Sequence, residues 1–236
     1  MATKNLVTRA ILVIAAFATA ALLASPSARA AEKLVPLEIK LPKPLFQGTP
    51  KNIKAGPGLE KYNEKPRPEF KVPEGVTNLA LHKKVTASDS QPVVGELSMI
   101  TDGDKEGSDG SFVELAPDKQ WVQIDLEQPA QIYAIVVWHY HGEARVYHDV
   151  VIQAADDADF IENVQTIYSN DFDNSSGLGV GKDLEYIEDF RGRLIDARSA
   201  KGEPVKGRYV RLFSKGNTSS DLNHYVEVEI YGRPVK

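Results

Sequence analysis

Trp121-Val-Gln-Ile-Asp-Leu126 and Gln131-Ile-Tyr-Ala-Ile-Val-Val-Trp-His-Tyr140 are the two stretches that decide the fold. In the first, polar or aromatic residues alternate with aliphatic ones. Val122, Ile124 and Leu126 therefore share one face of a β-strand, opposite Trp121, Gln123 and Asp125. In the second, residues 132–138 are apolar on both faces. That pattern predicts a central strand, buried on both sides.

The rest of the chain after residue 76 has the same texture of short β-type stretches. Val, Ile and aromatic residues concentrate in these stretches, and clusters of Gly, Asn, Asp and Ser separate them. The further predicted strands span residues 80–86, 149–154, 165–168, 208–213 and 225–231. The best helix-like stretch, residues 183–190, is short. The pattern predicts an all-β sandwich or barrel over residues 78–236.

The first 30 residues have the pattern of a signal peptide. Lys4 and Arg9 precede an apolar run over residues 10–24, and Ala28-Arg-Ala30 is a small-residue cleavage site. The run is shorter than the roughly 20 residues that span a bilayer. We expect cleavage after Ala30 and a protein that is secreted, periplasmic or on the cell surface, with no transmembrane segment after cleavage. The alternative is an uncleaved membrane anchor.

Charge and cysteine content exclude several classes of function. The chain has 28 basic and 33 acidic residues, a net charge of −5, which becomes −8 once the three basic residues of 1–30 are removed. This acidic balance argues against nucleic acid as a partner. The sequence contains no cysteine, so disulfides, thiolate metal sites and a cysteine nucleophile are excluded.

Residues 31–77 differ in kind from the rest, with eight prolines between positions 31 and 73. Proline lacks a backbone donor, so we expect neither a helix nor a sheet ladder in this segment. Leu34, Val35, Leu37 and Phe46 are too apolar for a solvated tether. We expect an extended arm that packs on the domain or on a protein partner; the alternative is a disordered spacer.

Six motifs follow one another between residues 78 and 232. They are Asn78-Leu-Ala-Leu-His-Lys-Lys-Val-Thr-Ala-Ser88, Ile100-Thr-Asp-Gly-Asp104, Trp121-Val-Gln-Ile-Asp-Leu126, Val151-Ile-Gln-Ala-Ala-Asp-Asp157, Gly207-Arg-Tyr-Val-Arg-Leu212 and Tyr225-Val-Glu-Val-Glu-Ile-Tyr-Gly232. In this order they resemble the motifs of discoidin-type domains (coagulation factor V/VIII C-type, galactose-binding-like). The resemblance implies an antiparallel, jelly-roll-like β-sandwich that binds glycans, phospholipid head groups or proteins, in most members without catalysis. Two features depart from it: His82 stands where the family has Gly, and residues 170–206 are longer than usual.

The resemblance also implies a structural Ca²⁺ near the Asp-Gly turn and the closing strand. Carried over by position, the ligands are the side chains of Asp102, Glu227 and Ser111 and the carbonyls of Met99, Asp104 and Val226. Ca²⁺ takes 6–8 oxygen ligands, and a Gly-containing turn lets several carbonyls converge. The alternative is an Asx-turn at Asp102 without a metal.

Three of the five histidines fall within residues 138–149, directly after the central predicted strand. The candidate ligand-binding residues are His139, His141, Glu143, Arg145 and His148, with Asn223 and His224 from the loop 214–224 as a second wall. Three interpretations stay open. The loop binds a glycan, or it holds a transition metal through histidine and carboxylate ligands, or its histidines are satisfied by neighbouring groups and serve packing.

Recognisable catalytic arrangements are missing from the sequence, which has neither Gly-x-Ser-x-Gly nor His-Glu-x-x-His. We therefore expect an exported, non-catalytic module that binds carbohydrate or another cell-surface ligand. One alternative is a metal-dependent hydrolase or lyase centred on residues 139–148. Another is a structural protein of the cell envelope, whose Pro-rich arm docks a neighbour.

Overall fold

The computed structural model describes residues 32–46, 48–54 and 56–235. The described residues from Lys33 onward belong to one compact unit. The predicted signal peptide, residues 1–30, lies outside the described residues. Within the described residues, no helix has the length and apolarity needed to cross a membrane.

Strands dominate the described part of the chain. The first six are β1 (Leu34–Pro36), β2 (Lys71–Pro73), β3 (Thr77–Asn78), β4 (Val85–Ala87), β5 (Val113–Leu115) and β6 (Lys119–Trp138). The next six are β7 (Val151–Ala155), β8 (Gln165–Ser169), β9 (Arg193–Asp196), β10 (Val205–Lys215), β11 (Asn223–Tyr225) and β12 (Glu227–Pro234). The helix described is one 3₁₀ turn, Leu97–Thr101, and every paired strand is antiparallel. The fold is an all-β antiparallel sandwich, as predicted.

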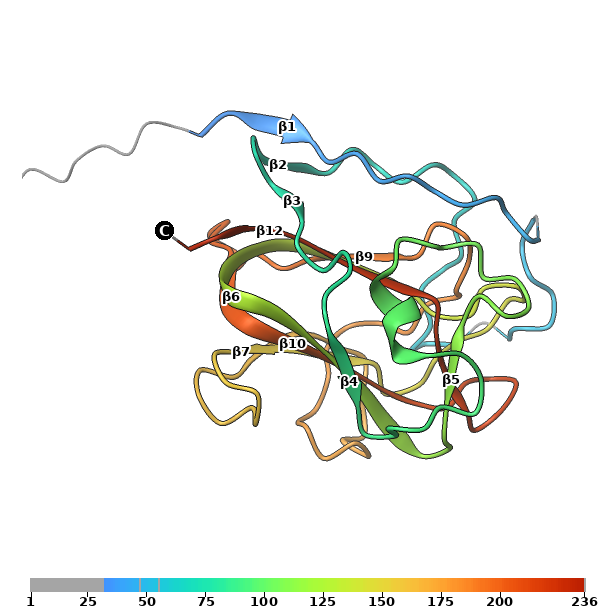
Figure 1. Ribbon diagram of the computed structural model, residues 1–236. Coiled ribbons are helices and arrows are strands. Elements are labelled where there is room, and N and C mark those ends of the chain that lie inside the picture. Colours follow the sequence, from blue (N-terminus) through green and yellow to red (C-terminus); the bar gives the residue numbers. More distant parts are fainter. Residues whose placement is uncertain (1–31, 47, 55, 236) are drawn as a thin grey trace, which may run out of the picture. The chain divides into compact units, whose positions relative to one another are not determined.

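Strand β6 organises both layers (Figure 1). Its first half pairs with β4 on one side and β10 on the other, and β10 continues to β7 and β8. Its second half pairs with β12 and β9, and β12 continues to β3. The two strands predicted at 121–126 and 131–140 are therefore one long strand. It passes from the first layer to the second near Glu127, whose φ is 68°.

The core lies between the two layers and receives alternate residues of β6. Val122, Ile124, Ile135 and Val137 are fully buried in it. The predicted inward face of 121–126 is thus confirmed. The opposite face is only partly polar, because Gln123 is also nearly buried, at 7% exposure.

The outer face of the second layer is covered by the Pro-rich arm. Ala134, Val136 and Trp138 of β6 are buried there, and Leu37 and Phe70 of the arm pack against this group. The apolar character of residues 132–138 on both faces thus has two causes, the core on one side and the arm on the other. The arm packs on its own domain, which was one of the two expectations.

One expectation about local structure is wrong. The arm does contain a ladder, since β1 pairs with β2 through Leu34↔Pro73 and Pro36↔Lys71. The prolines lie at strand ends of a two-stranded ribbon, where a missing donor costs little. The stretch 183–190 is not helical: Glu185 and Ile187 instead make isolated bridges to Leu59 and Val146.

Candidate ligand-binding site

His139 and His141, at the end of β6, are completely buried. His139 Nδ1 lies 2.6 Å from Glu188 Oε1, and its ring stacks on Tyr147 with centroids 4.4 Å apart. His141 Nε2 lies 2.9 Å from the carbonyl oxygen of Lys105. Each ring thus has one nitrogen with a neighbouring partner, while His139 Nε2 and His141 Nδ1 are buried without one. Neither ring is exposed to a ligand from solvent.

Asn223 and His224, chosen as the second wall, are buried as well. The Asn223 amide donates to the carbonyls of Ala116 and Asp118 at 2.9 Å, and its oxygen accepts from Ser214 and Gly216. His224 Nε2 lies 3.0 Å from Glu114 Oε2, and burial lowers the pKa of this histidine. These two residues fix the loop rather than face a ligand.

Glu143, Arg145 and His148 are the predicted residues that solvent reaches. The Arg145 guanidinium lies 4.5 Å from the Tyr140 ring centroid and 3.3 Å from Glu143. His148 Nδ1 lies 2.7 Å from Glu185 Oε1, and this hydrogen bond raises the pKa of His148. Of the seven predicted ligand-binding residues, these three stay available for recognition.

The two predicted loops do meet. Thr218 N donates to the Val146 carbonyl at 3.0 Å, and His148 N donates to the Gly216 carbonyl at 3.1 Å. A hollow of about 380 Å³ opens beside them. Its lining includes Val146, His148, Glu185 and Thr218, together with Asn52, Ile53, Lys54 and Leu59 of the arm. Such a mixture of apolar surface with a few polar groups is typical of small-ligand sites.

The histidine loop does not assemble a transition-metal site. Among the described residues, one group of three acidic or histidine side chains brings ligand atoms within 4.8 Å of one another, and it is Asp149, Asp171 and Asp173. Their oxygens already accept hydrogen bonds from Ser175 and Ser176. This cluster is a candidate cation site of the 170–183 loop, separate from the residues expected for Ca²⁺.

The turn expected to hold Ca²⁺ does lie against the closing strand. Gly103 N donates to Glu227 Oε2 at 3.2 Å, while Glu227 Oε1 is buried without a protein partner. Burial, reinforced by Glu229 and Asp102, raises the pKa of Glu227 to about 9. An orphaned buried carboxylate oxygen beside the turn fits an oxygen-liganded cation.

The other expected Ca²⁺ ligands are the side chains of Asp102 and Ser111 and the backbone carbonyls of Met99, Asp104 and Val226. Asp102 Oδ1 accepts from Asp104 N at 2.8 Å, as in the Asx-turn alternative, and Asp104 Oδ1 accepts from Glu106 N at 2.9 Å. Ser111 Oγ lies 3.5 Å from Ser108 Oγ. Met99 lies in the middle of the 3₁₀ turn Leu97–Thr101, and Val226 N donates to the Trp138 carbonyl.

Sequence reasoning missed the acidic partners of the histidines. Glu185 and Glu188 both come from the insertion 170–206, and Glu114 comes from β5. The stretch 184–190 has no period-2 alternation of apolar and polar residues, so its extended backbone left no such sign in the sequence. Which histidine each carboxylate meets depends on tertiary placement alone.

No family model matches the chain, and no curated protein matches it in sequence. Among solved structures it is similar to a fucose-binding module of Streptococcus pneumoniae, with 19% identity, a TM-score of 0.45 and coverage of 66% of this chain and 97% of that one. A fucolectin from striped bass (Morone saxatilis) serum matches with 19% identity, a TM-score of 0.45 and coverage of 68% and 50%.

A family 89 glycoside hydrolase from Clostridium perfringens matches with 20% identity and a TM-score of 0.47, over 67% of this chain. The chain spans only 15% of the length of that hydrolase. The likeness to all three structures is one of fold.

Proposed function

We propose that this chain is an exported, non-catalytic carbohydrate-binding module. The observation that carries the proposal is the hollow where the loops 142–148 and 216–220 meet the arm. His148 and Thr218 offer hydrogen bonds to sugar hydroxyls, while Val146 and Leu59 offer apolar surface to a ring. Glu185 Oε1 lies 2.7 Å from His148 Nδ1, and this contact orients the ring.

Binding without turnover is supported by the state of the histidines. His139, His141 and His224 are buried against their own partners, so they are not free to act on a ligand. The histidine in the hollow, His148, is held by Glu185. Such pre-oriented polar groups favour specific recognition because little ordering remains when a ligand binds.

A structural Ca²⁺ is part of the proposal. Glu227 and Asp102 are the side chains that would hold it, with carbonyls of the turn completing the oxygen shell. The ion would satisfy the orphaned Glu227 oxygen and join the turn 100–104 to β12. Its role is structural, because neither carboxylate lines the hollow.

Glycan-array binding of the full chain, followed by calorimetry on the best glycan, tests the function. We expect His148→Ala to weaken binding about tenfold or more, since a ligand hydrogen bond and its oriented donor are lost. The matched control is His82→Ala, an exposed histidine outside the hollow, which should bind normally. If the protein binds no glycan, either with Ca²⁺ or with EDTA, the proposal is wrong.

A further inference from the structure

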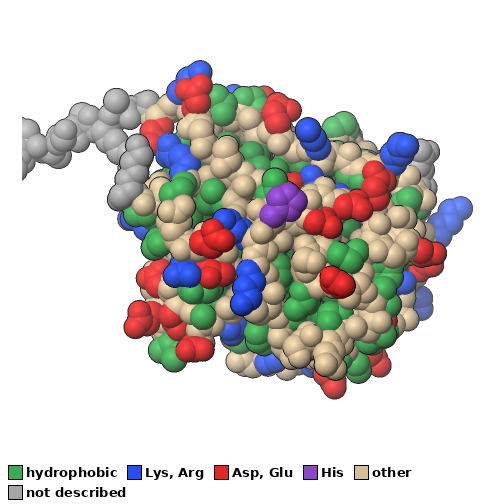
Figure 2. All heavy atoms as spheres, viewed as in Figure 1, with side chains coloured by type: hydrophobic (Ala, Val, Ile, Leu, Met, Phe, Trp, Pro, Cys, Tyr) green, Lys and Arg blue, Asp and Glu red, His purple; other side chains and the backbone are tan. Residues whose placement is uncertain are grey.

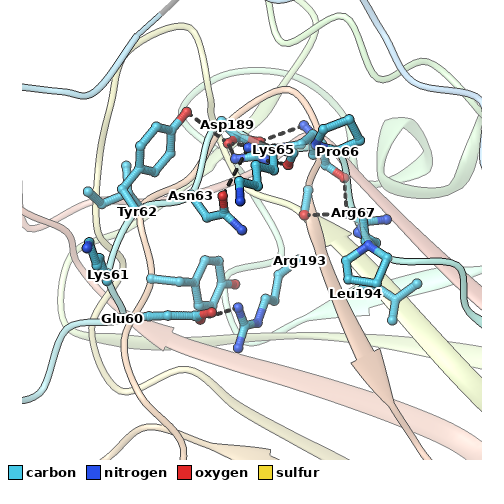
Figure 3. Close-up of a pocket in the computed structure, with 15 residues that line it drawn as sticks. Glu60, Lys61, Tyr62, Asn63, Lys65, Pro66, Arg67, Asp189, Arg193 and Leu194 are labelled. Atoms are coloured by element: carbon cyan, nitrogen blue, oxygen red, sulfur yellow. Dashed lines mark hydrogen bonds and ion pairs between the residues drawn. The ribbon is translucent and has the colours of Figure 1, made fainter.

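A second hollow, of about 270 Å³, lies between residues 60–68 of the arm and residues 186–194 of the insertion. Figure 3 shows Tyr62, Arg67, Asp189 and Arg193 arranged around it. None of the predicted ligand-binding residues lines it. It is formed by the arm and the insertion, the two segments that lie outside the six sequence motifs.

Positive charge is concentrated in this second hollow. Five cationic side chains line it against two carboxylates, in a chain whose net charge is −5. The lining cations are Lys61, Lys65, Arg67, Arg191 and Arg193. On the face drawn in Figure 2, by contrast, acidic and basic side chains are interspersed. An excess of cations in a concave site focuses the field on an anion.

The two carboxylates are already engaged. Asp189 forms a bidentate ion pair with Arg191, and Glu60 Oε2 lies 2.5 Å from Arg193 Nη1. Across the described residues, no carboxylate lies within ion-pair distance of Arg67, and the same holds for the lysines at 61 and 65. Asp189 acts on Arg67 only beyond ion-pair distance, so the hollow keeps an excess of positive charge.

Two of the cations, Arg67 and Arg191, are held in place by backbone carbonyls. Arg67 Nη2 donates to the carbonyls of Arg191 and Gly192 at 2.5 and 2.8 Å, and Arg191 Nη1 donates to the Lys65 carbonyl at 2.8 Å. These bonds tie the arm to the insertion. Burial and the neighbouring Arg191 lower the pKa of Arg67, as expected of a cation short of counter-charge.

Two buried polar atoms of the lining have no protein partner. They are the hydroxyl of Tyr186, a residue only 7% exposed, and Nε of Arg193. The Arg193 guanidinium lies 4.8 Å from the Tyr186 ring centroid, so the two groups form one wall. Both atoms lie beneath the surface of the hollow, so the cations and not these two atoms are the groups that a ligand meets there.

We propose that this second hollow binds the carboxylate-bearing unit of an acidic saccharide. A planar guanidinium matches a carboxylate in geometry, and charge-assisted hydrogen bonds of this kind are the strong ones. The volume is slightly below the range of drug-sized sites, which suits one sugar unit. Asn63 supplies a polar partner for a ring hydroxyl, and the Tyr62 ring supplies an apolar face. The site is separate from the one proposed for the histidine loop.

Calorimetric titration of the full chain with trigalacturonate, and with neutral galactotriose as its counterpart, tests the proposal. We expect trigalacturonate to bind and galactotriose not to bind at this site. Arg67→Gln should weaken binding about tenfold or more, because a charged hydrogen-bonding partner is lost. The double substitution Lys61→Gln with Lys65→Gln, at two exposed positions, should weaken it without affecting folding.

Two further variants sharpen the test. Glu60→Gln removes the carboxylate that competes for Arg193, so trigalacturonate should bind several-fold more tightly. Arg208→Gln is the matched control, since Arg208 pairs with Asp125 outside the hollow and should bind like the wild type.

Several results would overturn the assignment. They are no binding of trigalacturonate, equal loss in Arg208→Gln and Arg67→Gln, or tighter binding of oligoglutamate, which would point to an acidic peptide instead. His148→Ala separates this site from the loop site, because it should leave trigalacturonate binding unchanged while weakening the neutral glycan.

Discussion

Glu227 is the residue whose environment demands most explanation. One of its oxygens accepts from Gly103, the other is buried without a protein partner, and burial raises its pKa to about 9. Without a cation the side chain is therefore protonated at neutral pH. Its contribution to stability is present below the ordinary pKa of 4.5 and is lost as pH rises through about 9.

Glu227→Gln should consequently change the free energy of unfolding in EDTA at pH 7 by less than about 1 kcal/mol, since glutamine resembles the protonated acid. The same substitution should abolish stabilisation by Ca²⁺, which binds the folded state only through the carboxylate. Thermal unfolding with Ca²⁺ and with EDTA measures both effects. Equal Ca²⁺ stabilisation of variant and wild type would exclude Glu227 as a ligand.

His148, a basic side chain, gives a second pH dependence. Its hydrogen bond to Glu185 raises its pKa above the ordinary 6.5. The pair stabilises the fold fully below pH 6.5, and this contribution is lost as pH rises through the raised pKa. An NMR titration of the ring should give a midpoint above 6.5 in the wild type and a lower one in Glu185→Gln. Identical midpoints would contradict the pairing.

His82, the departure from the family glycine, has a φ of 58°. This left-handed backbone disfavours a β-carbon, whereas glycine tolerates it at some cost in unfolded-state entropy. His82→Gly should therefore raise the free energy of unfolding by up to about 1 kcal/mol in urea denaturation. Lys84→Gly, at an exposed position of ordinary φ, is the control and should lower it. If both substitutions changed the free energy of unfolding in the same direction, this explanation would be wrong.

At the scale of elements, the strands were predictable where one residue pattern decides them. Alternation in 121–126 and the apolar run 132–138 located both halves of β6, because burial in a sheet has a period of two. Their fusion into one strand was not predictable, since residues 127–130 carry no such pattern. The ladder of β1 and β2 was not predictable either, because its two short segments are joined only by tertiary contact.

Among site residues, the sequence located the histidines but not their surroundings. Glu188 is the partner of the buried His139 and Glu185 that of the half-buried His148, and both lie in an insertion without a motif. Arg67 and Arg193 likewise come together only because the arm folds back on the insertion. Contacts between distant segments of this kind leave no periodic trace in sequence.

The arm provides a test at the same scale. Phe70 packs on the outer face of β6 and β12 and lies 4.6 Å from the Arg198 guanidinium. Phe70→Ala should lower the free energy of unfolding by about 2 kcal/mol, as expected for truncating a partly buried aromatic residue. Leu45→Ala, an arm residue 43% exposed, should cost less than about 0.5 kcal/mol. Equal costs measured by urea denaturation would show that the arm is not docked.

At the scale of the molecule, arm and sandwich form one compact unit between residues 33 and 236. Removing residues 33–77 would uncover Val136 and Trp138, which are fully buried in the whole chain. We expect the shortened protein to have a lower unfolding temperature and to bind a hydrophobic dye, because large exposed apolar patches are unfavourable in solution. An unchanged unfolding temperature would mean that the sandwich is complete without the arm.

The long strand β6 has a consequence for the order in which the protein is made. Its second half finds its partner in β12, which leaves the ribosome last among the described strands. A nascent chain that ends before Glu227 therefore carries a Val- and Ile-rich strand with an open edge. Such an edge invites aggregation, and non-local pairing closes slowly, in milliseconds to seconds. The second layer can close only after β12 has emerged, and a chaperone that shields β6 until then should raise the yield of folded protein.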